Sequence, residues 1–523
     1  MKVSLADPRL GPIPADANFD GLSRKELILM LRMEHEIRMT LAGYVHELQE
    51  KVLEINGQLF RIRSKMFDRS SEKTPRPRKG KKNNSSNKKR TPTNLLPSER
   101  YPDAEIVEKH ITPVKPPCCG CCGNTMTDSG MTETSEYLTV IPKKYLIVRQ
   151  YRHKYRCAGC HGSIVTTPGL PRVVPGSAYS DELAVDATMS KYCDLIPMER
   201  YCDMAARQGF PGIPPHSLIG LTFKLAEFMR GIYEDLRRET LATKVLLADE
   251  TPHRMLEGHE RKTWFLWGFL GNDSCFYECH GTRSGDVASN VLTQSNCEVL
   301  LTDVYAGYRK AVREANELRA AKGKPMIAMA YCNSHARRGF KLGTDPGPPE
   351  AEFMLEHYRK IYQLEALAKS DPSNLIAEHR EAMKPLFTAM YSHAQTCIEQ
   401  FSNKGALGKA FNYFIGNYDG LTLFLDHPFV PIDNNASERN LRSHVVGRKT
   451  WLGTHSQEGA EAAAIHFSIV QSCKLIGLNP RLYYTKTIER LHSGKARLTP
   501  KAFSNEQQSN TSKTPRPRAS RSS

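Results

Sequence analysis

The chain has 523 residues, in which Lys and Arg outnumber Asp and Glu by 73 to 56, giving a net charge of +17. This length is too great for one compact core and predicts about three or four structural units. The sequence contains no run of about 18 apolar residues, and its N-terminus lacks the apolar core of a signal peptide. These features argue against a membrane-spanning or secreted protein, and we expect a cytoplasmic one.

A long amphipathic helix is predicted at residues 23–65. Apolar residues recur there at alternating spacings of three and four from Leu27 to Ile62, interrupted by Glu34 and Arg38. This pattern is typical of a coiled coil; the alternative is a helix that packs on its own protein. We favour self-association, and hence a homodimer or higher oligomer formed through this segment.

The positive charge is concentrated in the segment that follows. Residues 61–90 contain thirteen Lys and Arg residues against two acidic ones, and residues 66–100 are rich in Pro, Ser and Asn. Such a stretch buries too little apolar surface to fold, and its charge attracts the phosphates of nucleic acid. We predict a disordered basic linker with DNA as its partner; the alternative is a solvated linker without one.

Two Cys-x-x-Cys pairs predict a zinc-binding domain at residues 101–170. The expected ligands are Cys119, Cys122, Cys157 and Cys160. Four thiolates suit one tetrahedral, structural Zn²⁺ ion, and cysteines spread thinly over so long a chain argue against disulfides. Cys118 and Cys121 share the spacing of the first pair, but Gly123 directly after Cys122 suits a tight turn. His161 is an alternative to the last ligand.

Strands and then helices are expected beyond the first cysteine pair. Residues 137–141 and 145–151 have the composition of strands, whereas residues 177–242 have a helical pattern broken by Gly and Pro at 209–215. Two helices joined by such a turn predict a helix-turn-helix DNA reader. The alternative is a packed helix pair that does not contact DNA.

A catalytic α/β core is predicted at residues 243–475. Strands are expected at 244–249, 263–271, 275–280, 298–303 and 325–332, and helices at 305–320 and 333–342. Three hairpin-like strands followed by a strand, a helix and a strand are the order of a mixed sheet of the ribonuclease-H type. Residues 345–428 indicate a helical insertion, 476–497 a C-terminal helical segment and 498–523 a disordered tail.

Three acidic residues stand in contexts that suit a divalent-metal site. Asp249 and Asp303 each close an apolar run, Leu-Leu-Ala-Asp and Leu-Leu-Thr-Asp, while Glu438 lies near a helix start. Carboxylates placed in this way hold two Mg²⁺ ions in enzymes that cut and rejoin phosphodiester bonds. The alternatives are ordinary strand-ending Asp residues and a capping box from Asn435 to Glu438. Asp433 is the next candidate for the third acid.

Basic side chains near these acids are candidate DNA contacts. They are His335, Arg337, Arg338, Arg439, Arg442, Arg448 and Lys449. Cationic side chains grip the DNA backbone and so position it without reading its sequence. The alternative is a basic, solvated helix surface.

These motifs, in this order, resemble the IS66-type insertion-sequence transposases. The resemblance rests on Ala-Asp249-Glu-Thr-Pro, Asp303-Val-Tyr-Ala-Gly-Tyr, His335-Ala-Arg-Arg and Asp433-Asn-Asn-Ala-Ser-Glu-Arg-Asn-Leu-Arg. It implies a DDE transposase with a ribonuclease-H-like domain, an acidic triad of Asp249, Asp303 and Glu438, and two Mg²⁺ (or Mn²⁺) ions. It also implies a bacterial, nucleoid-associated protein whose partners are element-end DNA, target DNA and small accessory proteins of the same element. The chain departs from the family pattern at Asn333 and His253.

We therefore predict a transposase that binds the terminal repeats of a mobile element, cleaves DNA by two-metal hydrolysis and joins the 3′-OH ends to target DNA. Two other functions fit the same features. One is a catalytically silent protein that binds and bridges DNA ends. The other is a structure-specific nuclease of the ribonuclease-H type, which needs no terminal sequence and joins no ends.

Overall fold

The computed structural model describes, without a break, residues 164–256, 263–342, 347–371 and 375–513. Before residue 164 it describes parts of the segments 23–52, 96–110, 117–126 and 135–156. The chain divides into a larger unit, Met1–Asp68 with Tyr151–Arg207 and Pro211–Ser523, and a smaller unit, Arg69–Gln150 with Gln208–Phe210. None of the described helices is long and apolar enough to cross a membrane.

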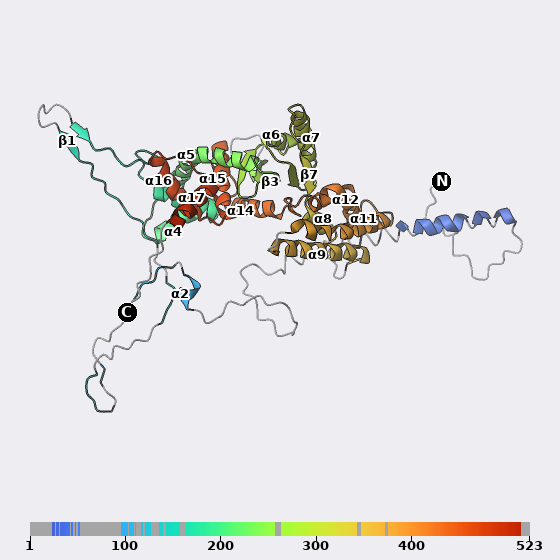
Figure 1. Cartoon of the computed structure of the whole chain (residues 1–523), viewed down its shortest axis with the longest axis horizontal. Helices are drawn as coiled ribbons and strands as arrows, with labels where there is room; N and C mark the ends of the chain where they lie inside the picture. Colours follow the sequence, from blue (N-terminus) through green and yellow to red (C-terminus); the bar gives the residue numbers. More distant parts are fainter. Residues whose placement is uncertain are drawn as a thin grey trace. The chain divides into compact units, whose positions relative to one another are not determined.

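A five-stranded mixed sheet lies at the centre of the larger unit (Figure 1). Its strands, in spatial order, are β5 (Cys275–His280), β4 (Thr263–Leu270), β3 (Val245–Arg254), β6 (Val299–Thr302) and β7 (Ala328–Tyr331). β3, β4 and β5 pair antiparallel, whereas β3, β6 and β7 pair parallel. The mixed α/β architecture predicted from the sequence is confirmed, although β3 runs five residues beyond its predicted end.

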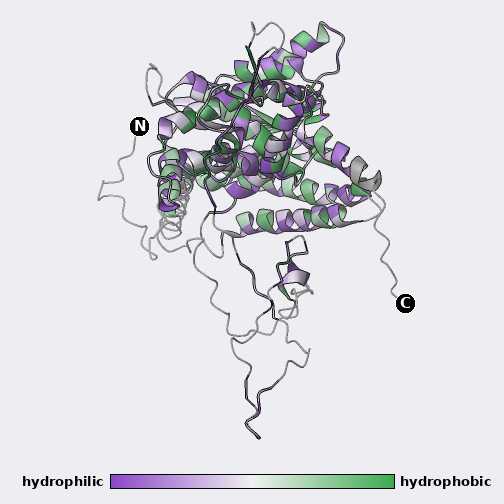
Figure 2. Cartoon of the chain, turned by 90° about the vertical axis from the view of Figure 1, so that its left-hand side faces the viewer, coloured by the Kyte–Doolittle hydropathy of each residue, from purple (hydrophilic) through white to green (hydrophobic). Residues whose placement is uncertain are grey.

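Helices cover both faces of this sheet because its side chains alternate between two cores. Leu246 and Leu300 belong to one core, with residues of α5 (Pro215–Leu241), α6 (Gly285–Gln294) and α7 (Ala306–Ala320). Leu247 and Leu301 belong to the other, with residues of α8 (Asn333–Gly339) and α14 (Asn435–Trp451). Helix α15 (Gln457–Leu475) packs against β5 and α5 and contributes to both cores. Figure 2 shows hydrophobic and hydrophilic residues alternating along the helices.

Helix α6 differs from expectation, because the sequence pattern alone predicts no helix between β5 and β6. A signal for it is nevertheless present. Ser284 is its N-cap and accepts a hydrogen bond from the backbone N–H of Asp286, which also places a negative charge in the first turn. Val291 and Leu292 are fully buried against the sheet side of the unit. A ten-residue helix has too few turns for its period to be conspicuous.

The helical pattern expected before the sheet forms α3 (Asp181–Thr188), a π-helical turn η1 (Met189–Cys193), α4 (Met198–Arg207) and α5. The second of the two helices expected as a DNA reader is α5, which is 27 residues long. Leu225, Met229 and Ile232 on α5 are fully buried, and the helix packs against α15 and β5. One side of α5 is thus part of the core, and its role as a DNA reader remains a prediction.

The helical insertion predicted between β7 and α14 forms a block of its own (Figure 1). Its elements are α9 (Pro349–Ser370), α10 (Ile376–Glu381), α11 (Lys384–Ile398), α12 (Ala406–Gly416), α13 (Tyr418–Thr422) and the 3-10 turn η2 (Leu423–Leu425). A buried ion pair joins α9 to α10: Arg380 donates to both Glu365 carboxylate oxygens, at 2.9 and 3.2 Å, and to the carbonyl of Phe424 at 2.7 Å. Losing either charged partner would leave the other buried without compensation.

The C-terminal region corrects one prediction. Helix α16 (Pro480–His492) lies in the predicted helical segment, but α17 (Pro500–Lys513) occupies most of the tail that was expected to be disordered. Phe503, 6% exposed, packs edge-on against Tyr483 with 5.4 Å between ring centroids. Lys501 also pairs with Asp273 at 2.7 Å. Arg490 of α16 pairs with Glu506 at 2.9 Å as well, so α17 is docked by one buried aromatic residue and two ion pairs despite its polar composition.

The smaller unit contains the first cysteine pair. Helix α2 (Pro97–Arg100) falls at the end of the predicted linker, where the carboxylate of Glu136 accepts hydrogen bonds from the N–H and the hydroxyl of Ser98, both at 2.9 Å. Cys118 forms an isolated antiparallel bridge with Thr125, and Gly123 in the intervening turn has φ of 74°. A positive φ of this size suits the tight turn that is predicted from Gly123 after Cys122.

The strands predicted between the cysteine pairs are not observed. The described residues of 137–141 and 145–151 form no strand, and Leu146, Ile147 and Val148 are all at least 70% exposed. Composition alone does not make a strand that has no sheet partner and no core to face. In the larger unit a short antiparallel hairpin forms instead from β1 (Lys154–Arg156) and β2 (Ile164–Thr166).

Several N-terminal predictions lie outside the described residues or are not tested by them. Cys119, Cys157, Cys160 and His161 are outside, as is most of the basic linker. The residues described between 24 and 52 are helical, in agreement with the predicted helix. The coiled coil itself remains a prediction.

Candidate acidic site at the ends of β3 and β6

Two of the three predicted acids lie at matching positions on neighbouring parallel strands. Leu247 of β3 pairs with Leu301 of β6, and Asp249 and Asp303 each follow two residues later. Since side chains alternate along a strand, both carboxylates are on the same face as Leu247 and Leu301, the face that α14 covers. Sheet pairing thus brings together two acids that are 54 residues apart in the sequence.

The neighbouring acids change the pKa of Asp249. Burial, followed by repulsion from Glu250, Asp303 and Glu438, raises the pKa of Asp249 to about 7. Only one hydrogen bond is observed at its carboxylate that opposes this, from the backbone N–H of Glu250 at 2.9 Å. The structure therefore gathers negative charge at this point without supplying enough positive charge to balance it. Perturbation of this kind is typical of functional sites.

The second strand-end acid is held by its own turn. Asp303 accepts a hydrogen bond from the backbone N–H of Tyr305 at 3.1 Å, at the start of α7. This short-range bond fixes the aspartate at the junction between strand and helix. Asp303 therefore does what an ordinary turn Asp does, which is the alternative named above, and it also lies beside Asp249.

Glu438 does not cap its helix. Helix α14 begins at Asn435, and its N-cap Asn434 makes no side-chain capping bond, so Glu438 comes one position too late for a capping box. The capping role in fact belongs to Asp433, which accepts hydrogen bonds from the backbone N–H of Asn435 at 3.2 Å and from Tyr362 at 2.9 Å. The capping alternative for Glu438 is wrong, and Asp433 is already engaged.

One Glu438 oxygen is left without a partner. Its Oε1 is buried and has no hydrogen bond among the described residues. His335 Nδ1 lies 3.6 Å from Oε1, and the guanidinium of Arg338 lies 3.8 Å from Oε2. Both distances are too long for good hydrogen bonds. A buried carboxylate oxygen in this condition is available to a ligand.

Asn434 fixes α14 against the strand that carries Asp249, and sequence reasoning missed it. Its side-chain amide donates to the carbonyl of Ala248 at 2.9 Å, and its backbone N–H donates to the thiol of Cys332 at 3.2 Å. Asn434 is 1% exposed. These two bonds join β3, the end of β7 and the start of α14, and so determine where Glu438 stands relative to Asp249. In the sequence, the only signal for a role of Asn434 was its position next to Asp433.

A buried histidine pair forms a second contact between β3 and α14. His253 Nδ1 lies 3.1 Å from His444 Nε2, and His253 Nε2 lies 2.7 Å from the hydroxyl of Thr454. Burial lowers the pKa of His253 to about 4 and that of His444 well below its ordinary value. Both imidazoles are therefore neutral at pH 7 and share one proton between the facing nitrogens. The departure from the family pattern at His253 has a structural partner in His444.

The other departure from the family pattern is structural as well. Asn333 is fully buried, and its amide donates to the carbonyls of Leu421 at 2.8 Å and Ile432 at 3.1 Å. Tyr358 of α9 donates to its carbonyl oxygen at 3.3 Å. Asn333 therefore connects the insertion to the segment that leads into α14.

Glu250, next to Asp249, points to the opposite side. Its carboxylate accepts two hydrogen bonds from Arg283, at 2.6 and 2.8 Å, and one from Tyr308 at 2.5 Å. Its side chain is 2% exposed. Glu250 is thus fully engaged in the other core, and its influence on Asp249 is electrostatic.

The predicted basic residues are partly gathered at the site. His335 and Arg338 of α8 are beside Glu438, as described above, whereas Arg337 lies over the ring of Tyr362, 5.5 Å from its centroid. On α14 the basic candidates Arg439, Arg442 and Lys449 are exposed. Arg448 donates to the carbonyl of Pro252 on β3 and thus holds α14 to the strand. Arg448 and Arg337 are thus the basic candidates that contact other parts of the protein away from Glu438.

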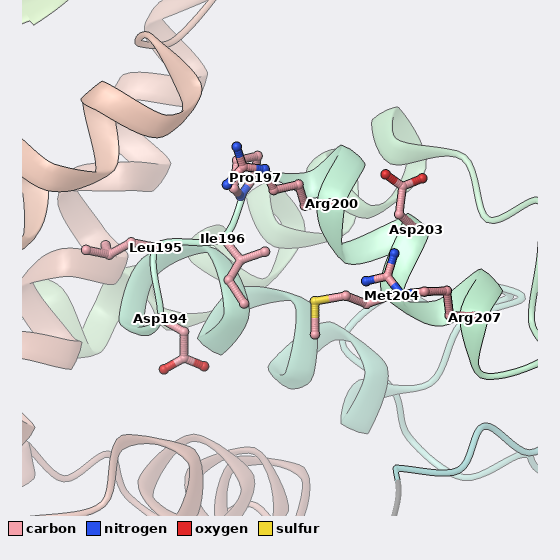
Figure 3. Close-up of a pocket in the computed structure, with 8 residues that line it drawn as sticks. All are labelled: Asp194, Leu195, Ile196, Pro197, Arg200, Asp203, Met204 and Arg207. Carbon is pink, nitrogen blue, oxygen red and sulfur yellow. The ribbon is translucent and has the colours of Figure 1, made fainter. Parts of the chain in front are cut away.

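A surface hollow of about 440 Å³ lies elsewhere in the larger unit. Figure 3 shows Ile196 and Met204 reaching into the space between the turn after η1 and helix α4. Its lining residues lie between positions 194 and 207, so it includes none of the predicted site residues. The acidic site is not at this hollow.

Comparison with known proteins identifies the family of the chain. Residues 176–462, more than half of the chain, match the model described as "Transposase IS66 family", and residues 116–161 match that of the "zinc-finger binding domain of transposase IS66". Two relatives are the uncharacterized proteins y4jD and y4hP of Sinorhizobium fredii. The first is 25% identical over 73% of this chain and 76% of its own length, the second 23% identical over 75% and 74%. The chain belongs to the IS66 family of transposases.

Proposed function

We propose that this chain is a DDE transposase in which Asp249, Asp303 and Glu438 form the catalytic acids. The observation that carries the proposal is the convergence of the three on the face of the sheet under α14, where burial and mutual repulsion raise the pKa of Asp249 to about 7. The order β5-β4-β3-β6-β7, with three antiparallel and then two parallel strands, supports a core of the ribonuclease-H type. In that arrangement the two strand-end acids stand at the centre of the sheet.

The residues present fit two bound Mg²⁺ (or Mn²⁺) ions. Carboxylate oxygens are the ligands that these hard cations prefer, and the site has an excess of negative charge together with the unpartnered Oε1 of Glu438. Asp249, Asp303 and Glu438 would hold the ions. When bound, the ions activate a water molecule and neutralise the charge that develops on the phosphate oxygens. A cation also keeps Asp249 ionised, although in its absence that carboxylate binds a proton near neutral pH.

Each part of the site has a task in the proposed reaction. Asn434 and the His253–His444 pair hold α14 on β3 and so keep Glu438 in range of Asp249. His335, Arg337, Arg338, Arg439, Arg442 and Lys449, with a smaller contribution from Arg448, position the DNA backbone. Water cleaves the phosphodiester at the end of the element and leaves a 3′-OH. That hydroxyl then attacks a phosphodiester of target DNA and displaces its 3′ oxygen.

The remaining regions supply binding and assembly. We propose that Cys119, Cys122, Cys157 and Cys160 hold one structural Zn²⁺, which the match to the family's zinc-finger model supports. The basic segment 66–100 and the helix pair α4–α5 contact DNA, and residues 23–65 join two or more copies. Accessory proteins encoded by the same element are further partners.

The deciding experiment is Mg²⁺-dependent cleavage and joining of a labelled DNA that carries the terminal repeats of the element. Asp249→Asn, Asp303→Asn and Glu438→Gln should each lower cleavage by about 100-fold or more, because a lost metal ligand removes several kcal/mol of transition-state stabilisation. Glu458→Gln is the matched control, since Glu458 is an exposed acid in the first turn of another helix. It should cleave like the wild type.

Three other results would redirect the proposal. Full cleavage by all three acid variants would sink it. A wild type that binds and bridges the ends but never cuts them would indicate a silent DNA-bridging protein. Cleavage that ignores the terminal sequence and joins nothing would indicate a nuclease.

A further inference from the structure

A second set of potential metal ligands adjoins the acidic site. Cys332 follows β7 and is the N-cap residue of α8, His335 lies in the first turn of α8, and Glu438 faces them from α14. Their donor atoms, one each of sulfur, nitrogen and oxygen, all lie within 4.8 Å of one another. Among the described residues this is the one group of three or more such side chains so close together, and it includes neither Asp249 nor Asp303.

Two of the three donor atoms lack a partner that their burial requires. His335 Nδ1 and Glu438 Oε1 are both buried, and neither has a hydrogen bond within the described part of the chain. A buried polar atom without a partner costs about 1–3 kcal/mol, and here two such atoms are 3.6 Å apart. The native fold tolerates this arrangement at a point where three different kinds of ligand atom meet.

The third donor is prepared in a different way. Cys332 is fully buried, and its sulfur accepts the backbone N–H of Asn434 at 3.2 Å. Burial raises the pKa of the Cys332 thiol to about 11, and this N–H group opposes the rise by stabilising the thiolate that metal binding requires. Asn434 therefore supports Cys332 with its backbone while its side chain anchors α14 to β3.

We propose that Cys332, His335 and Glu438 bind one thiophilic divalent cation of the Zn²⁺ class, in a site that is separate from the cysteine pairs and shares only Glu438 with the proposed Mg²⁺ site. Thiolate, imidazole and carboxylate are the ligands of zinc, whereas Mg²⁺ binds oxygen. Three protein ligands leave a fourth position open to water. Binding releases the thiol proton to solvent.

The dimensions of the cluster suit a tetrahedral ion. Bond lengths of about 2.0–2.3 Å place the ligand atoms of tetrahedral zinc about 3.3–3.7 Å apart. The 3.6 Å between His335 Nδ1 and Glu438 Oε1 already falls in this range. Since no separation in the cluster exceeds 4.8 Å, a contraction of at most about 1 Å is needed, which rotation of the His335 and Glu438 side chains, 30% and 33% exposed, supplies.

The site shares Glu438 with the proposed catalytic acids, so its consequence rests on the proposed function. A Glu438 carboxylate drawn toward Cys332 and His335 is turned away from Asp249 and Asp303. Occupancy by Zn²⁺ should therefore inhibit Mg²⁺-dependent cleavage, and the inhibition should depend on Cys332. The cluster would then be an inhibitory metal site, or brake, that works by withdrawing Glu438 from the proposed catalytic acids.

Cobalt(II) is the probe, because its bond to thiolate produces a near-ultraviolet charge-transfer band that oxygen and nitrogen ligands do not give. Full-length wild type, Cys332→Ser and Cys297→Ser are titrated with Co²⁺. Cys297 is the matched control, a buried thiol that lies beside Ser295 and outside the cluster. Cys332→Ser should lose one equivalent of the band and Cys297→Ser none. Identical titrations of the two variants would overturn the site.

A second variant guards against a folding effect of the cysteine change. Glu438→Gln leaves the thiol intact and should weaken the Cys332-dependent Co²⁺ binding by about tenfold or more. Unchanged binding would remove Glu438 from the ligand set and overturn the proposal as stated.

The cleavage assay separates this inference from the proposed function. If wild type never cleaves DNA with Mg²⁺, the proposed function fails while the Co²⁺ titration still decides the site. If it does cleave, Zn²⁺ should inhibit wild type at least about tenfold more than Cys332→Ser, each measured against its own activity without Zn²⁺. Equal inhibition of both would overturn the brake.

Discussion

Replacing Asp249 by Asn should stabilise the protein when divalent cations are removed, and the gain should grow with pH. Burial and then repulsion from Glu250, Asp303 and Glu438 raise the pKa of Asp249 from 3.8 to about 7. Between these values the folded protein binds more protons at this carboxyl group than the unfolded chain does. The free energy of unfolding of the metal-free protein therefore falls as the pH rises from about 4 to about 7. Asn carries no charge and escapes this loss.

The magnitude follows from the pKa. A rise from 3.8 to about 7 corresponds to about 4 kcal/mol, because each tenfold change in the proton equilibrium is worth 1.36 kcal/mol. Asp249 is only partly buried by surface area, and solvent screening reduces this to about 2 kcal/mol. Asn is nearly isosteric and keeps an oxygen for the N–H of Glu250. Because the unit that contains Asp249 has more than about 300 residues, the expected rise in Tm at pH 8 is about 3 °C, against little change at pH 5.

The assay is thermal unfolding of wild type and Asp249→Asn in EDTA between pH 5 and pH 8. Adding Mg²⁺ at pH 8 should raise the Tm of wild type, because the ion binds the folded state, and should raise that of the variant much less. Asp419→Asn is the control, since Asp419 is an exposed acid on α13, far along the chain from the site. Parallel curves of Tm against pH for wild type and Asp249→Asn would refute the account of this carboxylate.

Three further predictions concern stability. Asn434→Ala should cost about 1–3 kcal/mol, seen as a lower Tm, because it removes the amide bond between α14 and β3. Replacing the pair by His253→Val and His444→Leu should flatten the fall in Tm between pH 6.5 and pH 4.5. The pKa of His253 is lowered to about 4 in the folded protein, so the unfolded chain binds more protons in this pH range and the wild type loses stability as the pH falls. The double variant has no imidazole at these positions and escapes this loss. Phe503→Ala should release α17 from Tyr483, with faster proteolysis after residue 499; an unchanged digestion pattern would contradict the docking.

Local sequence patterns determined the strands and most of the helices of the larger unit. An apolar run followed by Asp, as before Asp249 and Asp303, predicts both strands; it predicts the end of β6 at Thr302, whereas β3 continues past Asp249 to Arg254. The family motifs then named the acids. Where local signals were weak, prediction failed: α6 is short, α17 has one buried aromatic residue, Phe503, in a polar sequence, and the apolar residues around Ile147 join no sheet among the described residues.

Only the tertiary structure decided which side chains meet. Asp433 and Glu438 lie on the same motif, but the first turn of α14 gives the capping bond to Asp433 and leaves Glu438 Oε1 unpartnered. Cys332 stands 106 positions before Glu438, and no spacing rule connects them. The contact arises because β7 and α14 are brought together through Asn434. Local propensity depends on neighbours in the chain, whereas a site depends on pairings between strands and helices that a single sequence does not encode in any short window.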